Sequence, residues 1–426
     1  MHPNALLDLS TELLKSVLKL DAPADGLVSM FFRNHRALGA RERHALTETT
    51  YAVLRSKLLY QHLAQTGSGA LERRLAILAW QGNEAFLRAA LAPHELKWLQ
   101  DKAAIDRHTL PEKLRHTLPD WLANPLREAL ADEFWPLVQA LGGTAPLDLR
   151  VNALKAKRED MQHVLAEAGV VAEPTPHSPW GLRVQGKPAL NGLDIFQGGS
   201  IEVQDEGSQL LALLLDPKRG EMVVDFCAGA GGKTLALGAA MRNTGRLYAF
   251  DVSGHRLDAL KPRLARSGLS NVHPAQIAHE RDDRVKRLAG KIDRVLVDAP
   301  CSGLGTLRRH PDLKWRQSPK VLDELQAKQA AILAGAARLL KPGGRLVYAT
   351  CSLLAVENER IADSFSAAHS ADFEPVQAQE ALDAAHVADS AALVRPQGAA
   401  AEGLYLRLWP HRHGTDGFFG AVWRRR

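Results

Sequence analysis

Four short apolar runs in the second half of the chain each end in an acidic residue or a cysteine. The runs cover residues 222–225, 247–251, 295–298 and 346–351. The stretches between them carry apolar residues at helical spacing, over residues 234–241, 256–266 and 321–340. Continuous apolar strands that alternate with helices form a parallel sheet covered on both faces, so the pattern predicts an α/β domain. Ligands of such sheets bind beyond the carboxyl ends of the strands, which is where these polar residues stand.

The first third of the chain shows a different pattern. The chain's 426 residues suffice for two or three domains, because an ordinary domain holds about 150 residues. Residues 1–140 carry leucines at helical spacing and show no alternating pattern, which predicts an all-α bundle. Within it we expect one helix over residues 45–63 and another over 71–80.

A domain boundary is predicted at residues 142–146, which read Gly-Gly-Thr-Ala-Pro. An alternating strand at 147–152 and a helix near 159–168 follow it. These elements predict a small α/β module over residues 145–200. The rest of the chain, residues 201–426, then forms the domain that carries the four apolar runs.

The last fifty residues depart from the strand-and-helix alternation. The Ala-rich run at 378–401 has little pattern and predicts a surface linker or insertion. Apolar segments at 404–409 and 420–423 flank a turn-rich stretch, which predicts a hairpin at the edge of the sheet.

Composition narrows the class of protein. The three cysteines, at 227, 301 and 351, exclude a disulfide scaffold and a zinc cluster built from cysteines alone. We therefore expect a reduced, cytoplasmic protein without a metal. No apolar run approaches the roughly 20 residues of a membrane-spanning helix, and no signal peptide is visible, so no membrane partner is expected. The net charge of +6 suits a polyanionic partner, although many enzymes without one share it.

The first strand-end loop, at 225–234, reads Asp-Phe-Cys-Ala-Gly-Ala-Gly-Gly-Lys-Thr. Its glycines let the backbone approach a ligand closely, and three ligand classes compete. A phosphate-binding loop needs glycine where Cys227 stands, and a dinucleotide fingerprint needs glycine where Thr234 stands. The third class is S-adenosylmethionine (SAM). Asp251, at the next strand end, suits the ribose of NAD or SAM, and a helix cap is the plain alternative.

Two further strand ends carry cysteines. Residues 298–303 read Asp-Ala-Pro-Cys-Ser-Gly, and residues 350–352 read Thr-Cys-Ser. A single cysteine at a strand end is usually a small buried hydrophobe. Two cysteines at neighbouring strand ends, one directly after Asp-Ala-Pro, favour a chemical role instead.

Together these motifs resemble the RsmB-type RNA (cytosine-5) methyltransferases of the Nop/Sun superfamily. The resemblance rests on the loop at 225–234 and on the segments at 298–303 and 350–352. Arg-Arg-His-Pro-Asp-Leu-Lys-Trp at 308–315 and Thr-Asp-Gly-Phe-Phe at 415–419 are also similar to that family.

The resemblance implies a fold for each part of the chain. It implies a Rossmann-like class I SAM-dependent methyltransferase domain over residues 201–426. It also implies a NusB-like RNA-binding domain at 1–140, with the small α/β module at 145–200 between the two. The implied partner is RNA, most specifically small-subunit ribosomal RNA.

The resemblance further implies a role for each site residue. Cys351 would attack carbon-6 of cytosine as a thiolate, Asp298 would bind the edge of the base, and Cys301 would assist release of the product. The implied SAM contacts are Cys227, Ala228, Gly229, Ala230, Gly231, Gly232, Lys233, Asp251 and Asp298. The implied RNA contacts are Arg308, Arg309, Lys314 and Trp315, for which a solvated basic loop is the plain alternative.

Two departures from the family pattern concern SAM. The family loop usually reads Cys-Ala-Ala-Pro-Gly-Gly-Lys, whereas Gly229 and Ala230 replace Ala-Pro here. His279 stands where the family usually has an aspartate near the adenine, with Glu280 and Asp282 close by. A ribosome-assembly factor without turnover and a nicotinamide-dependent dehydrogenase are the alternative functions, and the second leaves both strand-end cysteines unexplained.

Overall fold

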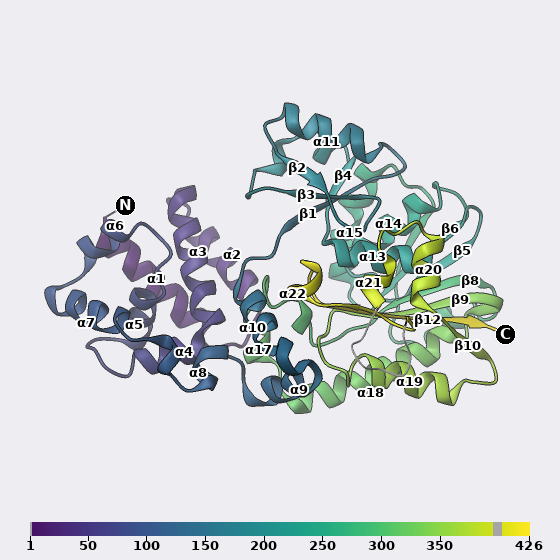
Figure 1. Cartoon of the computed structure of the whole chain (residues 1–426). Coiled ribbons are helices and arrows are strands. Elements are labelled where there is room, and N and C mark those ends of the chain that lie inside the picture. The colour runs from purple at the N-terminus through teal and green to yellow at the C-terminus, as the bar shows by residue number, and fades with distance from the viewer. Residues whose placement is uncertain (1, 395–402) are drawn as a thin grey trace. The chain divides into compact units, whose positions relative to one another are not determined.

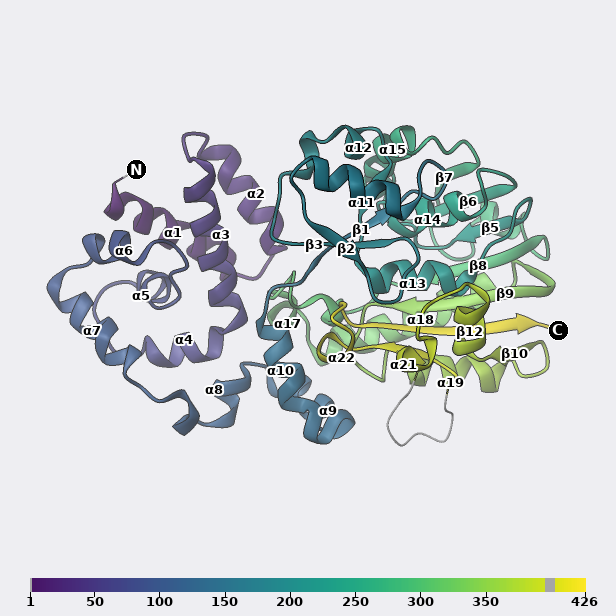
Figure 2. The ribbon, with the colours of Figure 1, turned by 45° about the horizontal axis from the view of Figure 1, so that its top comes forward.

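A computed structural model of the chain describes residues 2–394 and 403–426. The chain forms two compact units, which Figure 1 and Figure 2 show from two directions. The first unit comprises Met1–Thr144 and Thr306–Pro319, and the second comprises Ala145–Gly305 and Lys320–Arg426. No helix in the part of the chain that the structure describes is long and apolar enough to cross a membrane.

The first unit is helical, as the leucine spacing predicts. Its helices are α1 (Pro3–Val17), α2 (Ala24–Asn34), α3 (Ala40–Arg55), α4 (Lys57–Leu63), α5 (Leu71–Leu78), α6 (Glu84–Ala90), α7 (Pro93–Ala103), α8 (Glu112–His116), α9 (Asp120–Leu130), α10 (Phe134–Gly142) and α17 (Leu313–Arg316). Leucines on one face of α1, such as Leu7 and Leu14, are fully buried in its core. The single helix expected over residues 45–63 is wrong, because Ser56 leaves helical dihedral angles and separates α3 from α4.

The segment Thr306–Pro319 packs with these helices, although residues 201–426 were expected to form one domain. Lys314 Nζ donates to the carbonyl of Arg55 over 2.7 Å, and Trp315 Nε1 donates to the carbonyl of Leu54 over 2.7 Å. Both carbonyls lie at the end of α3, where a helix has no further amide of its own to satisfy them. The segment therefore completes the end of α3.

A small antiparallel sheet opens the second unit. Its strands are β1 (Leu147–Val151), β2 (Ala172–Pro174), β3 (Gly181–Val184) and β4 (Ile201–Val203), in the order β2-β3-β1-β4. Its helices are α11 (Arg158–Glu167) and α12 (Asp194–Gln197). The strand and helix expected near 147–152 and 159–168 are thus confirmed as β1 and α11. The sheet runs past the expected boundary at residue 200, because β4 pairs with β1.

The large sheet of the second unit is mostly parallel. Its strands are β5 (Met222–Asp225), β6 (Arg246–Asp251), β7 (Val272–Gln276), β8 (Ile292–Asp298), β9 (Leu340–Thr350), β10 (Phe373–Val376), β11 (Leu406–Leu408) and β12 (Phe418–Arg425). The order is β10-β12-β9-β8-β5-β6-β7, and β11 pairs with β12. The five strands from β5 to β9 are parallel, and β12 is antiparallel to β9. The predicted Rossmann-like fold is therefore confirmed.

Helices cover both faces of this sheet (Figure 1). They are α13 (Glu206–Leu215), α14 (Gly232–Ala240), α15 (Gly254–Ser267), α16 (Asp283–Lys286), α18 (Pro319–Ala337), α19 (Glu359–Ala368), α20 (Ala378–Ala384), α21 (Ser390–Val394) and α22 (Pro410–His413). In β5 the neighbours Val223 and Val224 are fully buried in two separate cores, because successive side chains of a strand point to opposite faces. The core beside Val223 includes α13, α14 and α15, and the core beside Val224 includes α18 and α19.

The end of the chain differs from its prediction in two ways. Residues 378–394 are not a linker, because α20 and α21 bury Leu382 and Leu393 in the same core as Val223. The remainder of that run, residues 395–402, lies outside the described residues. The predicted hairpin exists as β11 and β12, but β12 lies between β9 and β10 rather than at the sheet edge.

Candidate active site

The reactive residues lie at one edge of the large sheet. Asp225, Asp251 and Asp298 are the last residues of β5, β6 and β8, and Cys351 directly follows β9. Because these strands are parallel and adjacent, their carboxyl ends meet at the same edge. The second unit therefore brings together the strand-end residues that the sequence predicted to act together.

The glycine loop between β5 and α14 is held in a backbone conformation that favours glycine. Gly229 has φ +56° and Gly231 has φ +83°. The amide of Gly229 donates to Asp251 Oδ2 over 2.8 Å, and the amide of Ala228 donates to the carbonyl of Phe250. The loop is therefore anchored to the end of β6, so the expected loop and ribose contacts share one site.

Lys233 and Asp298 form an ion pair inside this edge. Lys233 Nζ lies 2.8 Å from Asp298 Oδ2, and the two side chains are 11% and 31% exposed. Burial disfavours the charge of Lys233, but Asp298 outweighs this effect, so the pKa of Lys233 lies above its ordinary value. The charges of Cys351 and Asp225 act in the same direction. Lys233 thus carries its charge in the site.

The two strand-end cysteines are in contact. Cys301 Sγ lies 3.3 Å from Cys351 Sγ. The hydrogen bond with Cys351 and burial raise the pKa of Cys301 well above its ordinary value. Burial also raises the pKa of Cys227, which packs against the core beneath the glycine loop. Cys301 and Cys227 are therefore neutral thiols, which suits neither to act as the first nucleophile.

Two glycines connect the cysteine loops to the start of β12 through backbone hydrogen bonds. The amide of Gly305 donates to the carbonyl of Cys351 over 2.8 Å, and the amide of Gly417 donates to the carbonyl of Gly305 over 2.9 Å. A Cβ on Gly305 would lie 2.0 Å from the carbonyl oxygen of Gly417, so only glycine fits there. The segment at 415–419, which belongs to the resemblance, therefore supports the cysteine loops structurally.

The residues present fit SAM at its amino-acid and ribose ends. Asp225 Oδ1 is buried beside the glycine loop and has no hydrogen-bond partner among the described residues. Val252, which directly follows Asp251, is 51% exposed and so leaves apolar surface next to that carboxylate. A ligand with a polar head and a planar ring would use both features, with its head near Asp225 and its ring over Val252.

His279 stands at the position expected near adenine, with Glu280 and Asp282 close by. Asp282 accepts hydrogen bonds from the amides of Ala278 and Arg284, each over 2.9 Å, and so caps α16. The first of these bonds is the main reason that the pKa of Asp282 is lowered. Glu280 lies 3.5 Å from Arg281 in an ion pair, and His279 Nδ1 accepts from the amide of the same arginine. All three residues therefore have local structural partners.

The residues expected to contact RNA lie elsewhere, in the segment that packs with the helical unit. Arg308 and Lys314 are buried, at 6% exposure each, which a solvated basic loop does not predict. Burial lowers the pKa of Lys314 to about 7. Trp315 is half-buried and, like Lys314, donates to a backbone carbonyl of α3. Lys314 and Trp315 therefore have structural partners, and RNA contact through Arg308, Arg309, Lys314 and Trp315 stays a prediction.

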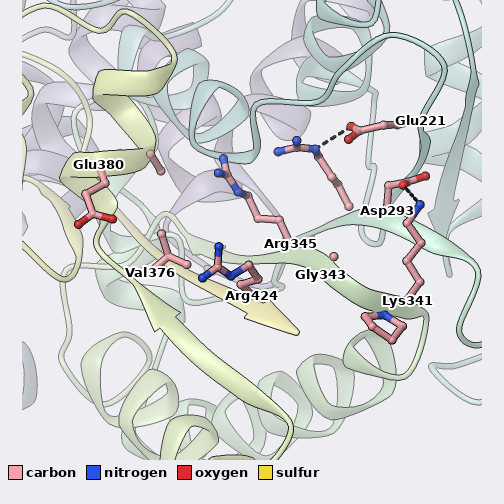
Figure 3. Close-up of a pocket in the computed structure, with 12 residues that line it drawn as sticks. Glu221, Asp293, Lys341, Gly343, Arg345, Val376, Glu380 and Arg424 are labelled. Carbon is pink, nitrogen blue, oxygen red and sulfur yellow. Dashed lines mark hydrogen bonds and ion pairs between the residues drawn. The ribbon is translucent and has the colours of Figure 1, made fainter. Parts of the chain in front are cut away.

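A separate cavity of about 470 Å³ lies at the opposite edge of the sheet (Figure 3). It opens where β5, β8 and β9 begin, and four of the charged residues that line it form two ion pairs. Arg294 lies 2.6 Å from Glu221, and Lys341 pairs with Asp293. These charges balance one another within the protein, and none of the three cysteines lines the cavity.

Comparison with known proteins shows the family of this chain. The sequence model of the family described as 16S rRNA methyltransferase RsmB/F matches residues 212–424, half of the chain. The chain belongs to the RsmB/F family. A second model from that family, for a ferredoxin-like domain, matches residues 118–191 and so begins before the small sheet does. The NusB-like assignment of the helical unit stays a prediction.

Relatives of this chain carry RsmB names. A probable ribosomal RNA small subunit methyltransferase B from Synechocystis is 38% identical over 279 residues, which are 64% of this chain and 58% of that protein. The chain therefore spans less than two thirds of this relative's length. The crystal structure of PH0851 is similar over 99% of both chains, with a TM-score of 0.78 and 26% identity. A methyltransferase homologue from Pyrococcus horikoshii has a TM-score of 0.63 and 29% identity, over 76% of this chain and all of that one.

The glycine loop makes the first testable prediction. A Cβ on Gly231 would lie 2.1 Å from Leu260 Cδ1, whereas a Cβ on Gly229 would meet nothing within 4 Å. Both residues have positive φ, so Gly229→Ala measures the backbone cost alone, about 1 kcal/mol of unfolding free energy. Gly231→Ala should cost about 2–4 kcal/mol, because overpacking adds to that cost. Urea unfolding measures both, and equal losses would contradict the predicted clash.

A second prediction concerns pH. Burial raises the pKa of Asp225 from 3.8 to about 7, while a hydrogen bond from Thr234 opposes the change. A pKa that is higher in the folded state stabilises the fold below pH 3.8, and this stability is lost as the pH rises to 7. Relative to Asp225→Asn, the natural protein should lose about 1.4 kcal/mol per pH unit between pH 5 and 7 and nothing further above pH 7. Denaturant unfolding of both proteins at each pH tests this, and a constant difference would contradict the shift.

Proposed function

We propose that this chain is a SAM-dependent RNA methyltransferase that forms 5-methylcytosine in small-subunit ribosomal RNA. The observation that carries the proposal is the contact between Cys301 and Cys351, 3.3 Å apart at neighbouring strand ends. One thiol of the pair is held neutral, and the ion pair of Lys233 and Asp298 lies at the same sheet edge. Membership of the RsmB/F family supports the choice of ribosomal RNA.

Carbon-5 of cytosine is a poor nucleophile, so the base must first be activated. The thiolate of Cys351 adds to carbon-6, which places the electron pair of the former double bond on the ring and makes carbon-5 nucleophilic. Lys233 donates to the edge of the base and Asp298 accepts from it, where charge develops during this addition. SAM, when bound, supplies the electrophilic methyl group.

Release requires that a base such as water take up the carbon-5 proton, so that the electron pair of that bond re-forms the double bond to carbon-6 and Cys351 leaves as a thiolate. Cys301 is placed to assist, because its neutral thiol lies within hydrogen-bond distance of the departing sulfur. A hydrogen bond to a thiolate stabilises its charge. We therefore assign attack to Cys351 and release to Cys301.

The cofactor would be held by the loop Cys227–Lys233 and by Asp251. Positive φ at Gly229 and Gly231 turns the loop at the end of β5, and Asp251 anchors it from the end of β6. A dehydrogenase is disfavoured, because Thr234 occupies the position of the third fingerprint glycine and donates to Asp225 over 2.6 Å.

Methyl transfer to defined RNAs tests the function. The purified protein would be incubated with SAM labelled in its methyl group and with small-subunit ribosomal RNA lacking modification, and 5-methylcytosine would be mapped by mass spectrometry. We expect label in cytosine of the ribosomal RNA and none in transfer RNA. Incorporation into neither RNA, with ribosomal RNA bound, would instead support an assembly factor without turnover.

A further inference from the structure

A fully buried carboxylate lies behind the two cysteines. Glu357 is 0% exposed, and its two oxygens accept four hydrogen bonds. The amide and hydroxyl of Ser302 donate over 2.8 and 2.5 Å, the hydroxyl of Ser352 over 2.5 Å and Gln329 Nε2 over 3.0 Å. Ser302 follows Cys301 and Ser352 follows Cys351, so one side chain contacts both cysteine loops.

Each oxygen of Glu357 accepts two hydrogen bonds, one from the amide of Ser302 and Gln329 Nε2 and the other from the two serine hydroxyls. An amide in its place would turn an NH₂ group toward one of these two sets, and the serine hydroxyls could face it only by rotating the hydrogens that they now donate. No lysine or arginine among the described residues forms an ion pair with Glu357. A buried carboxylate without a cation is rarely what stability alone favours.

Neighbouring contacts hold Glu357 itself in place. Tyr348, inside β9, donates its hydroxyl to the backbone carbonyl of Glu357 over 2.6 Å. Gln329, on α18, also donates to the carbonyl of Pro300, directly before Cys301. The carboxylate is therefore fixed to the sheet and to α18, whereas the two loops that it contacts are fixed partly through it.

We propose that Glu357 is a positioning residue, which sets the separation of Cys301 and Cys351 by bonding the serine that follows each of them. This role deepens the proposed function and rests on it for its catalytic consequence. The negative charge of Glu357 also contributes to the raised pKa of Cys301, after the hydrogen bond with Cys351, burial and the charge of Cys351. It thereby helps to keep Cys301 a neutral thiol beside the nucleophile.

Oxidation of the two thiols to a disulfide measures their separation without RNA or SAM. Diamide takes up the two hydrogens that Cys301 and Cys351 lose, and the product is quantified by mass spectrometry of the unreduced protein. We expect Glu357→Gln to slow this reaction about 100-fold, because small displacements of reacting atoms have effects of that size. Removal of a nearby negative charge would by itself favour thiolates and speed the reaction, so the direction separates positioning from electrostatics.

The matched control is Glu206→Gln, which alters a second fully buried carboxylate. Glu206 accepts hydrogen bonds from the amides of His177 and Ser178, over 2.7 and 2.8 Å, and neither amide belongs to a cysteine loop. Its oxidation rate should stay within about twofold of the natural protein, because it removes no bond to either loop. If Glu357→Gln does not fold, Ser352→Ala removes the bond to one loop and leaves the carboxylate in place. That variant should show slowing in the same direction.

The catalytic consequence is measured separately. With ribosomal RNA, Glu357→Gln should lower kcat about 100-fold while the Kd for SAM stays unchanged, because the glycine loop is not altered. Oxidation at the natural rate in both Glu357→Gln and Ser352→Ala would overturn the positioning role, whatever happens to methylation. Slowed oxidation together with no methyl transfer by the natural protein would leave positioning standing and contradict the proposed function.

Discussion

Replacement of Cys351 by alanine is expected to abolish methyl transfer. No other sulfur can take its place, because Cys301 is held neutral by its hydrogen bond and by burial, and Cys227 by burial. Loss of a covalent nucleophile typically lowers turnover by ~10³-fold or more. The rate would be measured with labelled SAM and ribosomal RNA, and the Kd for SAM should stay unchanged.

The matched control is Cys227→Ala, which removes a thiol from the same sheet edge. Cys227 packs against the core and takes no part in the contact between Cys301 and Cys351, so this variant should still transfer methyl groups when SAM is saturating. Residual turnover of Cys351→Ala near the natural rate would show that another group attacks the base.

Replacement of Cys301 by alanine is expected to trap a covalent RNA adduct. Cys351 keeps its place after β9 and still attacks, but no thiol then lies 3.3 Å from its sulfur to stabilise it as it leaves. The adduct should appear as a shifted protein band on a denaturing gel when RNA and SAM are both present. Multiple turnover should fall, while a first methyl transfer should remain detectable.

The double variant Cys301→Ala/Cys351→Ala decides which sulfur forms the adduct. It should give no shifted band, because the nucleophile is absent. An adduct that requires Cys301 and survives the loss of Cys351 would reverse the two roles. That outcome would also conflict with the raised pKa of Cys301, which makes it the poorer nucleophile at neutral pH.

The local sequence pattern predicted the strands that position the candidate site. Apolar runs that end in Asp225, Asp251 and Asp298 became β5, β6 and β8, because a strand buried on both faces must be apolar along its length. Parallel pairing then places the three carboxylates at one edge without any long-range information beyond the alternation with helices.

The sequence pattern did not predict the burial of segments that pack against residues far away in the chain. The Ala-rich run was expected to be a surface linker, yet α20 and α21 bury its few large residues, because small alanines allow close packing without a strong periodic signal. Lys314 and Trp315 belong to a basic motif for which a solvated loop was one expectation. Both instead donate to carbonyls at the end of α3, more than 250 positions earlier in the chain. The residues adjacent to either segment in the sequence do not indicate these distant partners.

The sequence by itself determined the class of fold, the edge of the sheet at which the polar strand-end residues meet and the two cysteines that we propose to act there. These depend on strand polarity and on residue types at strand ends, both of which are local properties. Only the tertiary structure decided that the two sulfurs touch, that Cys301 is the neutral partner and that Glu357 links their loops. Distances between loops and the desolvation of a thiol arise from packing across neighbouring strands, which no spacing along the chain encodes.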